Sequence, residues 1–534
     1  MKPLVWKALA CFAAFLFLAH AQVSVTTSRN DNNRDGQNLS ETILTPDNVN
    51  VASFGKLFAQ TVDGWVYAQP LYVPNVTIPG LGVHNVVYVA TEHDSVYAFD
   101  ADDNKGLNSS PLWHRSFISP KNGITTASSS DVNCNDIYPE IGVTSTPVID
   151  TTTGTMYLIA LTKANGHFIQ RLHALDITTG KERTGSPVVI QAKVKGNGEG
   201  SVNGVISFDH LQEGQRPGLL LQNGSVYIGW ASHCDNVPYH GWVMSYDETT
   251  LKQIAVWNST PNGGQGGVWQ SGTGLSADSD FNLFFALGNG TYDGIKGGED
   301  FSDTVVKLAP PVGNRFQLGD WFTPYNQLKL GDHDGDVGSG GSLLLPDQGT
   351  NAPHQHLLVQ VGKQGSIYLI DRDKMGHYNS HSNHQIVQDM ENAVGGLFGT
   401  PAWWNNNLYF GGINDNLRQY TFDTTTGLLS NGAVSVSSTY FAFPGPTPSI
   451  SANGDTNAIL WAVQTDTYEK KNIPATLHAY DATNIGTELY NTGQNGSRDS
   501  PGRAVKFSVP TVANGKVYVP AVEQLTVYGL LPGK

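Results

Sequence analysis

Eight short segments of this chain repeat one pattern, in which apolar and small or aromatic residues alternate and an aspartate usually ends the run. They are residues 96–100, 172–176, 243–247, 305–309, 367–371, 419–423, 477–481 and 525–529. Such alternation predicts half-buried β-strands, and the Asp, Asn and Gly residues that follow predict tight turns. The segments recur at intervals of roughly 50 to 75 residues, more than the ~40–50 of bare four-stranded units, so we expect loop insertions.

One such repeat cannot bury both faces of its sheet, so the repeats are expected to pack side by side in a ring. Eight of them predict an all-β fold, an eight-bladed β-propeller of four-stranded antiparallel blades. The last repeat ends near the C-terminus without a fourth strand, whereas residues 51–62 are strand-like and precede the first repeat. We therefore expect an N-terminal strand to complete the last blade and close the ring.

The N-terminus carries the pattern of an export signal at residues 1–21. Lys2 and Lys7 charge its start, residues 8–18 are apolar, and small residues surround a cleavage site before Gln22. The apolar run is short for a bilayer span, which makes a retained anchor the weaker alternative. We predict a secreted or periplasmic protein without stable membrane insertion, with a polar arm at residues 22–45 and one propeller at residues 46–532.

The net charge of the chain limits the kinds of binding partner that can be expected. The net charge of -15 disfavours a nucleic acid or an anionic membrane, because no basic patch is present to meet phosphates.

Cys11 leaves with the signal, and Cys134 and Cys234 remain. An oxidising compartment favours a disulfide between them, with two separate thiols as the alternative. The chain has no Cys-x-x-Cys-His motif, so no covalently attached haem is predicted.

Residues 267–336 hold the side chains that are best suited to contact a cofactor, bind a metal ion or act as a base. Trp269 offers a flat surface for a planar cofactor, and a packed core residue is the alternative. Asn289 offers an amide oxygen to a hard cation such as calcium, although Asn-Gly is also a common turn pair. The acidic run at 332–336 could contain a general base or form a metal-binding loop. The alternative is that it forms only a solvated turn. Insertions at 120–140, 193–216, 290–301 and 378–392 either build a binding face or decorate the surface.

The repeats, with the turn at residues 176–181, resemble the pyrroloquinoline quinone dehydrogenases, exported eight-bladed quinoproteins that oxidise alcohols or sugars. Residues 28–34, 44–49 and 68–73 look like the N-terminal entry and first blade of that family, and the likeness extends to the last blade. The resemblance implies pyrroloquinoline quinone and calcium as cofactors. It also implies a small alcohol or sugar substrate and a separate electron acceptor.

The resemblance also implies roles for individual residues. Trp269 matches the tryptophan under the quinone ring, Asn289 a calcium ligand, and Lys363 the lysine that contacts the quinone oxygens. In the acidic run, Asp334, with Asp336 behind it, lies near the catalytic aspartate of the family. For Lys363, a solvent-exposed lysine in a hairpin turn is the alternative.

Three positions depart from that family. Residues 230–235 lack its calcium-binding glutamate, for which Asp235 or His233 is the candidate replacement, although imidazole is a poor calcium ligand. Its disulfide between adjacent cysteines is absent, because Cys134 is followed by Asn135, and a Cys134–Cys234 bridge between two blades would replace it. Tyr67 stands roughly where the family has an acidic residue.

Two functions follow from these features. The first is a quinoprotein-like oxidoreductase, with Asp334 as general base assisted by Lys363. The second is a non-catalytic propeller that binds a glycan, a peptide or an envelope partner through its loops, because a fold does not fix a function. Whether Asp235 reaches the site of Asn289 discriminates between them.

Overall fold

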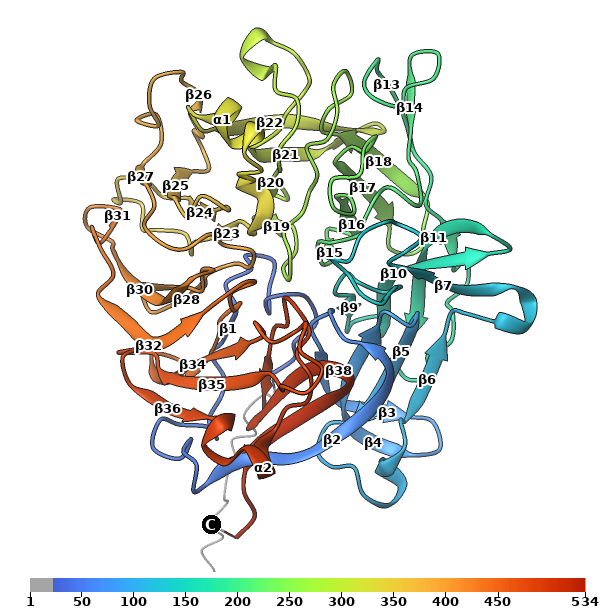
Figure 1. Ribbon diagram of the computed structural model, residues 1–534, viewed down its shortest axis with the longest axis vertical. Coiled ribbons are helices and arrows are strands. Elements are labelled where there is room, and N and C mark those ends of the chain that lie inside the picture. Colours follow the sequence, from blue (N-terminus) through green and yellow to red (C-terminus); the bar gives the residue numbers. More distant parts are fainter. Residues whose placement is uncertain (1–22, 534) are drawn as a thin grey trace, which may run out of the picture.

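The computed structural model describes residues 23–533, so the predicted export signal lies outside the described residues. Mostly antiparallel sheets stand side by side in a ring around a central axis (Figure 1). All eight segments that the repeat predicts as strands lie within strands. The predicted all-β architecture is therefore confirmed.

The first half of the ring consists of four groups of strands. In chain order its strands are β3 (Leu71–Ile78), β4 (Gly82–Thr91), β5 (Ser95–Asp100) and β6 (Trp113–Ser116); β9 (Val148–Asp150), β10 (Thr155–Ala164), β11 (His167–Asp176) and β12 (Val188–Val189); β15 (Leu220–Gln222), β16 (Ser225–Trp230), β17 (Trp242–Asp247) and β18 (Gln253–Asn258); and β19 (Ser276–Ala277), β20 (Leu283–Ala286), β21 (Val305–Val312) and β22 (Arg315–Thr323). Strands β18 and β22 join the last two groups through one parallel pair, Val256 with Arg315. The insertions add β7 (Ile124–Ser128) and β8 (Glu140–Ile141), which extend the sheet of β10, and the separate hairpin of β13 (Lys193–Lys195) and β14 (Val205–Ser207).

The second half repeats this arrangement. Its strands are β23 (Leu343–Leu344), β24 (Leu357–Val361), β25 (Ile367–Asp371) and β27 (Gln388–Met390); β28 (Ala402–Trp404), β29 (Asn407–Phe410), β30 (Asp415–Asp423), β31 (Leu428–Leu429) and β32 (Ser435–Phe441); β33 (Ser449–Asn453), β34 (Thr456–Gln464), β35 (Thr476–Asp481) and β36 (Glu488–Asn491); and β37 (Thr511–Ala513), β38 (Lys516–Leu530) and β2 (Phe54–Trp65). Strand β26 (His377–Tyr378) pairs with β22.

Strand β2 closes the ring. It runs antiparallel to β38, with Phe54 opposite Leu530 and Gln60 opposite Leu525. The predicted pairing of an N-terminal strand with the last repeat is thus confirmed. An apolar core then seals the join between the last sheet and the first, where Tyr518 and Val527 pack in one cluster with Tyr72, Val87 and Phe99.

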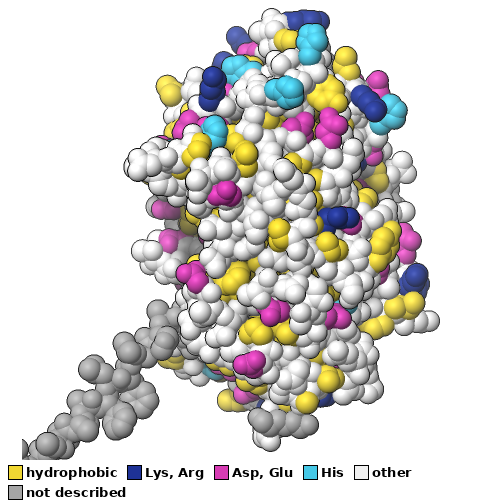
Figure 2. Space-filling view, turned by 90° about the vertical axis from the view of Figure 1, so that its left-hand side faces the viewer, with side chains coloured by type: hydrophobic (Ala, Val, Ile, Leu, Met, Phe, Trp, Pro, Cys, Tyr) yellow, Lys and Arg dark blue, Asp and Glu magenta, His cyan; other side chains and the backbone are white. Residues whose placement is uncertain are grey.

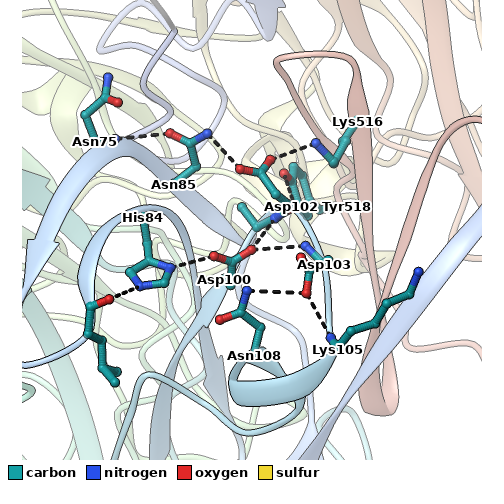
Figure 3. A network of polar contacts seen from close by, with 12 residues as sticks. Asn75, His84, Asn85, Asp100, Asp102, Asp103, Lys105, Asn108, Lys516 and Tyr518 are labelled. Atoms are coloured by element: carbon teal, nitrogen blue, oxygen red, sulfur yellow. Dashed lines mark hydrogen bonds and ion pairs between the residues drawn. The ribbon is translucent and has the colours of Figure 1, made fainter.

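The repeated aspartate at the end of the third strand caps the following turn. In Figure 3, Asp100 Oδ1 accepts hydrogen bonds from the main-chain N–H groups of Asp102, at 2.8 Å, and Asp103, at 3.0 Å. His84 Nδ1 lies 2.6 Å from Asp100 Oδ2, and Lys516 of β38 pairs with Asp102 at 2.8 Å. The same side-chain to main-chain bond follows Asp176, Asp247, Asp371, Asp423 and Asp481. This turn geometry explains why the motif ends on aspartate.

The polar arm that precedes β2 crosses the inner ends of the sheets. Its β1 (Gln37–Asn38) pairs in parallel with β33, and Arg29 and Arg34 are fully buried. Arg34 donates to Leu275 O at 2.7 Å and to Ser28 O at 2.6 Å. Main-chain oxygens of the arm accept hydrogen bonds from six sheets, through the N–H groups of Tyr72, Ile149, Ala277, Leu344, Trp403 and Ile450. The arm therefore ties the sheets together on the ring axis.

Helices are few and short. They are α1 (Gln327–Asp332), α2 (Gly496–Asp499) and the 3-10 turns η1 (Gly106–Ser109), η2 (Pro120–Asn122), η3 (Gly294–Lys296), η4 (Val337–Ser339) and η5 (Thr492–Asn495). Within residues 23–533, none is long and apolar enough to span a bilayer. On the face in Figure 2, acidic side chains are scattered singly among polar ones.

Candidate active site

A cavity of about 450 Å³ opens where loops from several sheets converge. Trp269, Lys363, Asp235, Asp334 and Asp336 all line it, so most of the predicted site residues come together. The remaining lining residues are Asp136, Arg216, Cys234, Ser271, Ser339, Phe398, Phe443 and Phe507. The inner strands of successive sheets face the ring axis (Figure 1), and several lining residues, such as Arg216, Ser339 and Phe398, lie in the loops that lead into them.

Trp269 forms one wall of this cavity. Its side chain is buried, its ring meets Tyr239 edge-on at 6.3 Å, and its indole N–H has no hydrogen-bond partner among the described residues. Glycine is needed at position 288, because a Cβ there would lie 2.7 Å from Trp269 Cδ1 and 2.4 Å from Asp336 Oδ1. The sequence Leu287-Gly-Asn289 therefore allows the ring and the carboxylate to approach the same backbone.

Asp336 and Lys363 form an ion pair within the cavity, with Asp336 Oδ2 2.8 Å from Lys363 Nζ. The main-chain N–H of Asn289 donates to Asp336 Oδ1 at 2.7 Å. Burial raises the pKa of Asp336, and Lys363 and the Asn289 N–H oppose that rise. Burial would lower the pKa of Lys363, but the charges of Asp336 and Asp334 raise it. Lys363 is thus a charged member of the site and not an exposed turn residue.

Asp334 and Asp336 have different surroundings. Asp334 also pairs with Lys363, but its side chain is 61% exposed, against 4% for Asp336. Asp334 has a left-handed backbone conformation, with φ of 54°. A buried carboxylate bound by a fixed N–H and a lysine is better oriented towards a ligand than a solvated one.

The side-chain oxygen of Asn289 is buried and has no hydrogen-bond partner within residues 23–533. An unpartnered buried carbonyl is costly, and a cation or water is its usual partner. Asp303, which sequence reasoning missed, is also buried, and one of its carboxylate oxygens is equally unpartnered within residues 23–533. Its other oxygen accepts from Val337 N at 3.2 Å, and burial raises its pKa well above the ordinary range.

Asp235 lines the same cavity and accepts a hydrogen bond from the Tyr239 hydroxyl. Burial raises its pKa, with Asp336 and Asp334 adding to the rise. His233 is buried, and burial lowers its pKa to about 4, so its ring is neutral. Asp235, Asp334 and Asp336 are too widely separated to share one ion by themselves. Among the described His, Cys, Asp and Glu residues, the only three whose side chains lie close enough together to hold a metal ion are Cys134, Asp136 and Cys234. The sulfurs of Cys134 and Cys234 are bonded to each other.

Cys134 and Cys234 form a disulfide beside the cavity, with Cα atoms 5.6 Å apart. The predicted bridge is therefore confirmed. It joins the insertion at 120–140 to the loop between β16 and β17, and Phe443 lines the cavity with Cys234.

Arg216 is the main cavity residue that the motifs did not indicate. It is buried, it donates to Ser271 Oγ at 3.1 Å, and its guanidinium lies 5.4 Å from the Trp269 ring centre. It ends the insertion at 193–216, in the run Gln215-Arg-Pro-Gly218, where a lone arginine among turn residues was the available signal.

Tyr67 lines a small adjoining void with Arg216. The acidic residue near this point is Glu92, which is buried and accepts from Gly142 N at 2.8 Å and Thr144 Oγ1 at 2.9 Å. Sequence reasoning missed Glu92, because it lies in the turn between β4 and β5 and outside any quoted motif.

Solved structures share this fold. A quinohemoprotein alcohol dehydrogenase from Pseudomonas putida HK5 matches with 14% identity and a TM-score of 0.61, over 95% of this chain and 80% of that chain. The quinohemoprotein alcohol dehydrogenase of Comamonas testosteroni matches with 14% identity and a TM-score of 0.60, over 96% and 82%. A europium-containing methanol dehydrogenase matches with 14% identity and a TM-score of 0.59, over 95% and 98%.

These matches confirm, at the level of fold, the predicted resemblance to the quinoprotein dehydrogenases. No protein-family model matches the chain, and no curated protein does. At this identity the likeness concerns the fold, and the chemistry of this chain has to be argued from its own residues.

Proposed function

We propose that this protein is an exported quinoprotein-like oxidoreductase that oxidises an alcohol or a sugar. The ring is proposed to be an eight-bladed propeller, with pyrroloquinoline quinone held in the axial cavity. The observation that carries the proposal is the convergence of Trp269, Asp336 and Lys363 on one cavity, where Asp336 accepts a hydrogen bond from the main chain of Asn289, whose side-chain oxygen is unpartnered among the described residues. The alcohol and methanol dehydrogenases of similar fold support the same chemistry.

The cavity residues fit a flat, anionic cofactor. Trp269 provides an aromatic wall, and Arg216 and Lys363 provide two cations for carboxylate and quinone oxygens. The free amide oxygen of Asn289 suits a hard cation, and Asp235 is the second proposed protein ligand for calcium. Since no three of the described cavity carboxylates lie close enough together to hold one ion, the remaining ligands would come from outside the protein.

The protein itself would supply a base and fix its orientation. We assign the base to Asp336 in preference to Asp334, because Asp336 is buried and its carboxylate is held by Asn289 N and Lys363. Asp336 would accept the hydroxyl proton of the substrate, and Lys363 would balance the charge of the site. When bound, the quinone would take up the hydride and electrons that an alcohol loses on oxidation. A separate acceptor would then remove the electrons.

The first test is a calorimetric titration of the purified mature protein with pyrroloquinoline quinone, with and without calcium. We expect saturable binding that strengthens with calcium and falls at least tenfold in Trp269→Leu and in Asn289→Ala. Trp321→Leu is the matched control, because Trp321 is half-buried in β22 and outside the cavity. Absence of binding with and without calcium would refute the proposal and favour the binding-module hypothesis.

A further inference from the structure

A second cavity, of about 530 Å³, adjoins the candidate active site, and we call it the outer chamber. The two cavities share Asp136, Cys234 and Phe443. The other residues of the outer chamber are Ser129, Ser130, Asn133, Cys134, Asn135, Tyr468, Glu469 and Lys506. Because the first cavity is proposed to hold the quinone, the outer chamber is the adjoining space in which a part of the substrate could lie.

Lys506 is the buried charge of the outer chamber, with 4% of its surface exposed. Its Nζ lies 5.1 Å from the ring centre of Tyr468, 5.6 Å from that of Phe507 and 5.8 Å from that of Phe443. The nearest paired carboxylate oxygen, Asp136 Oδ1, is 3.6 Å away, which is longer than a hydrogen bond. An ammonium with three donors is thus held among rings, with Asp136 at 3.6 Å as its paired carboxylate among the described residues.

Asp136 lies between two cations, Arg216 and Lys506. Its Oδ2 lies 3.8 Å from Nη1 of Arg216, while its Oδ1 faces Lys506. Burial lowers the pKa of Lys506, Asp136 opposes that fall, and the charge of Arg216 adds to it. The other carboxylate of the chamber, Glu469, is exposed. Asp136, whose side chain is 42% exposed, is therefore shared between two cations, and Lys506 keeps donors for an incoming anion.

We propose that the outer chamber binds a carboxylate group of the substrate, with Lys506 as its partner and the Phe443 and Tyr468 rings against its apolar body. The substrate class is then an alcohol that carries a carboxylate on an aromatic or apolar frame. This inference rests on the proposed function, because it specifies the substrate of the same site. A carboxylate of the cofactor has the same chemistry, and the experiment separates the two sources.

The test uses calorimetry on the mature protein without added cofactor, with 4-(hydroxymethyl)benzoate and its neutral counterpart benzyl alcohol as probes. We expect the wild type to bind the carboxylate more tightly, and Lys506→Met to lose roughly tenfold or more of that affinity, as for a charge-assisted hydrogen bond. Lys506→Arg should retain the preference. Lys470→Met, which removes an exposed lysine of the loop that carries Tyr468, is the control and should match the wild type. Benzyl alcohol should bind all four proteins equally.

The outcomes separate this subsite from the proposed function. Carboxylate binding that depends on Lys506, in a protein that does not bind pyrroloquinoline quinone, would support the subsite and refute the function. Equal binding of both probes by the wild type, or no binding of either, would overturn the subsite. A tenfold loss of quinone affinity in Lys506→Met, with unchanged binding of 4-(hydroxymethyl)benzoate, would also overturn it, because the lysine would then serve the cofactor.

Discussion

Asp336 and Lys363 are joined twice, through their side chains at 2.8 Å and through the hydrogen bond from Lys363 N to Asp336 O at 3.0 Å. The second contact links two loops of the backbone, so the ion pair does not depend on flexible side chains alone. This arrangement fixes a carboxylate against the wall of the cavity, as a positioned base requires.

Replacement of Asp336 should remove turnover without removing the fold. Asp336→Asn keeps the acceptor for Asn289 N and the shape of the side chain but cannot take a proton. We expect a loss of about 10²–10⁴-fold in kcat, with cofactor affinity changed less than the rate. Asp334→Asn is the matched variant, and its exposed side chain predicts a loss below about tenfold. Steady-state kinetics with a dye acceptor measures both, and the reverse ranking would assign the base to Asp334.

Lys363 should set the pH at which Asp336 works. Its charge favours the ionised carboxylate, so Lys363→Met is expected to raise the pKa of Asp336 further. The acidic limb of the kcat/KM profile would then move to higher pH, by about one unit or more. Lys363→Arg keeps the charge and should leave the limb near its original position. An unmoved limb in Lys363→Met would separate the lysine from the base.

The raised pKa of buried Glu92 predicts that the stability of the fold falls as the pH rises. Burial raises its pKa from 4.5 to about 8, and the hydrogen bonds from Gly142 N and Thr144 limit the rise. Between these two values the unfolded chain releases a proton that the folded protein keeps. Stability should therefore fall as pH rises from about 4.5 to 8, by up to about 1.4 kcal/mol per pH unit.

Thermal melts of Glu92→Gln across this range check the sign. The variant keeps an acceptor for both hydrogen bonds, so its Tm advantage over the wild type should grow between pH 5 and pH 8. Glu469→Gln, which removes an exposed negative charge, is the control. A Tm difference that is constant with pH would show that Glu92 does not titrate as described.

The Cys134–Cys234 bridge spans 100 residues of chain and should stabilise the fold substantially. Closure of a loop of this length is worth about 4.7 kcal/mol in the chain-entropy account, with about 2–5 kcal/mol typical of native bridges. In chemical denaturation, the free energy of unfolding of the double variant Cys134→Ser with Cys234→Ser should be lower than that of the wild type by about 2–5 kcal/mol. Reduction of the wild type should give the same loss, whereas an unchanged midpoint would mean that the bridge is not formed.

The strands were predictable because their signals are local. Alternating residues and a closing aspartate recur in each repeat, and Asp100 and its counterparts make the turn bonds that this motif implies. Trp269, Asn289 and Lys363 were also identifiable, since each lies in a short, motif-like segment beside a strand.

Other site residues have no local signal. Arg216, Lys506 and Phe507 lie in irregular loops, and closure of the ring alone brings them together. The choice between Asp334 and Asp336 depends on which carboxylate meets Asn289 N, a contact across 47 residues that spacing does not reveal. The burial of the arm has no local signal either, because nothing in its polar sequence indicates that Arg29 and Arg34 are fully buried.

Cofactor-dependent oxidation is the most direct test of the central claim. The mature protein, loaded with calcium and one equivalent of pyrroloquinoline quinone, would be assayed for dye reduction with a panel of alcohols, sugars and hydroxy acids. We predict turnover with at least one class in the wild type, none without the quinone, and a loss of about 10²–10⁴-fold in Asp336→Asn. Stoichiometric quinone binding without turnover on any class, or equal turnover in Asp336→Asn, would contradict the account.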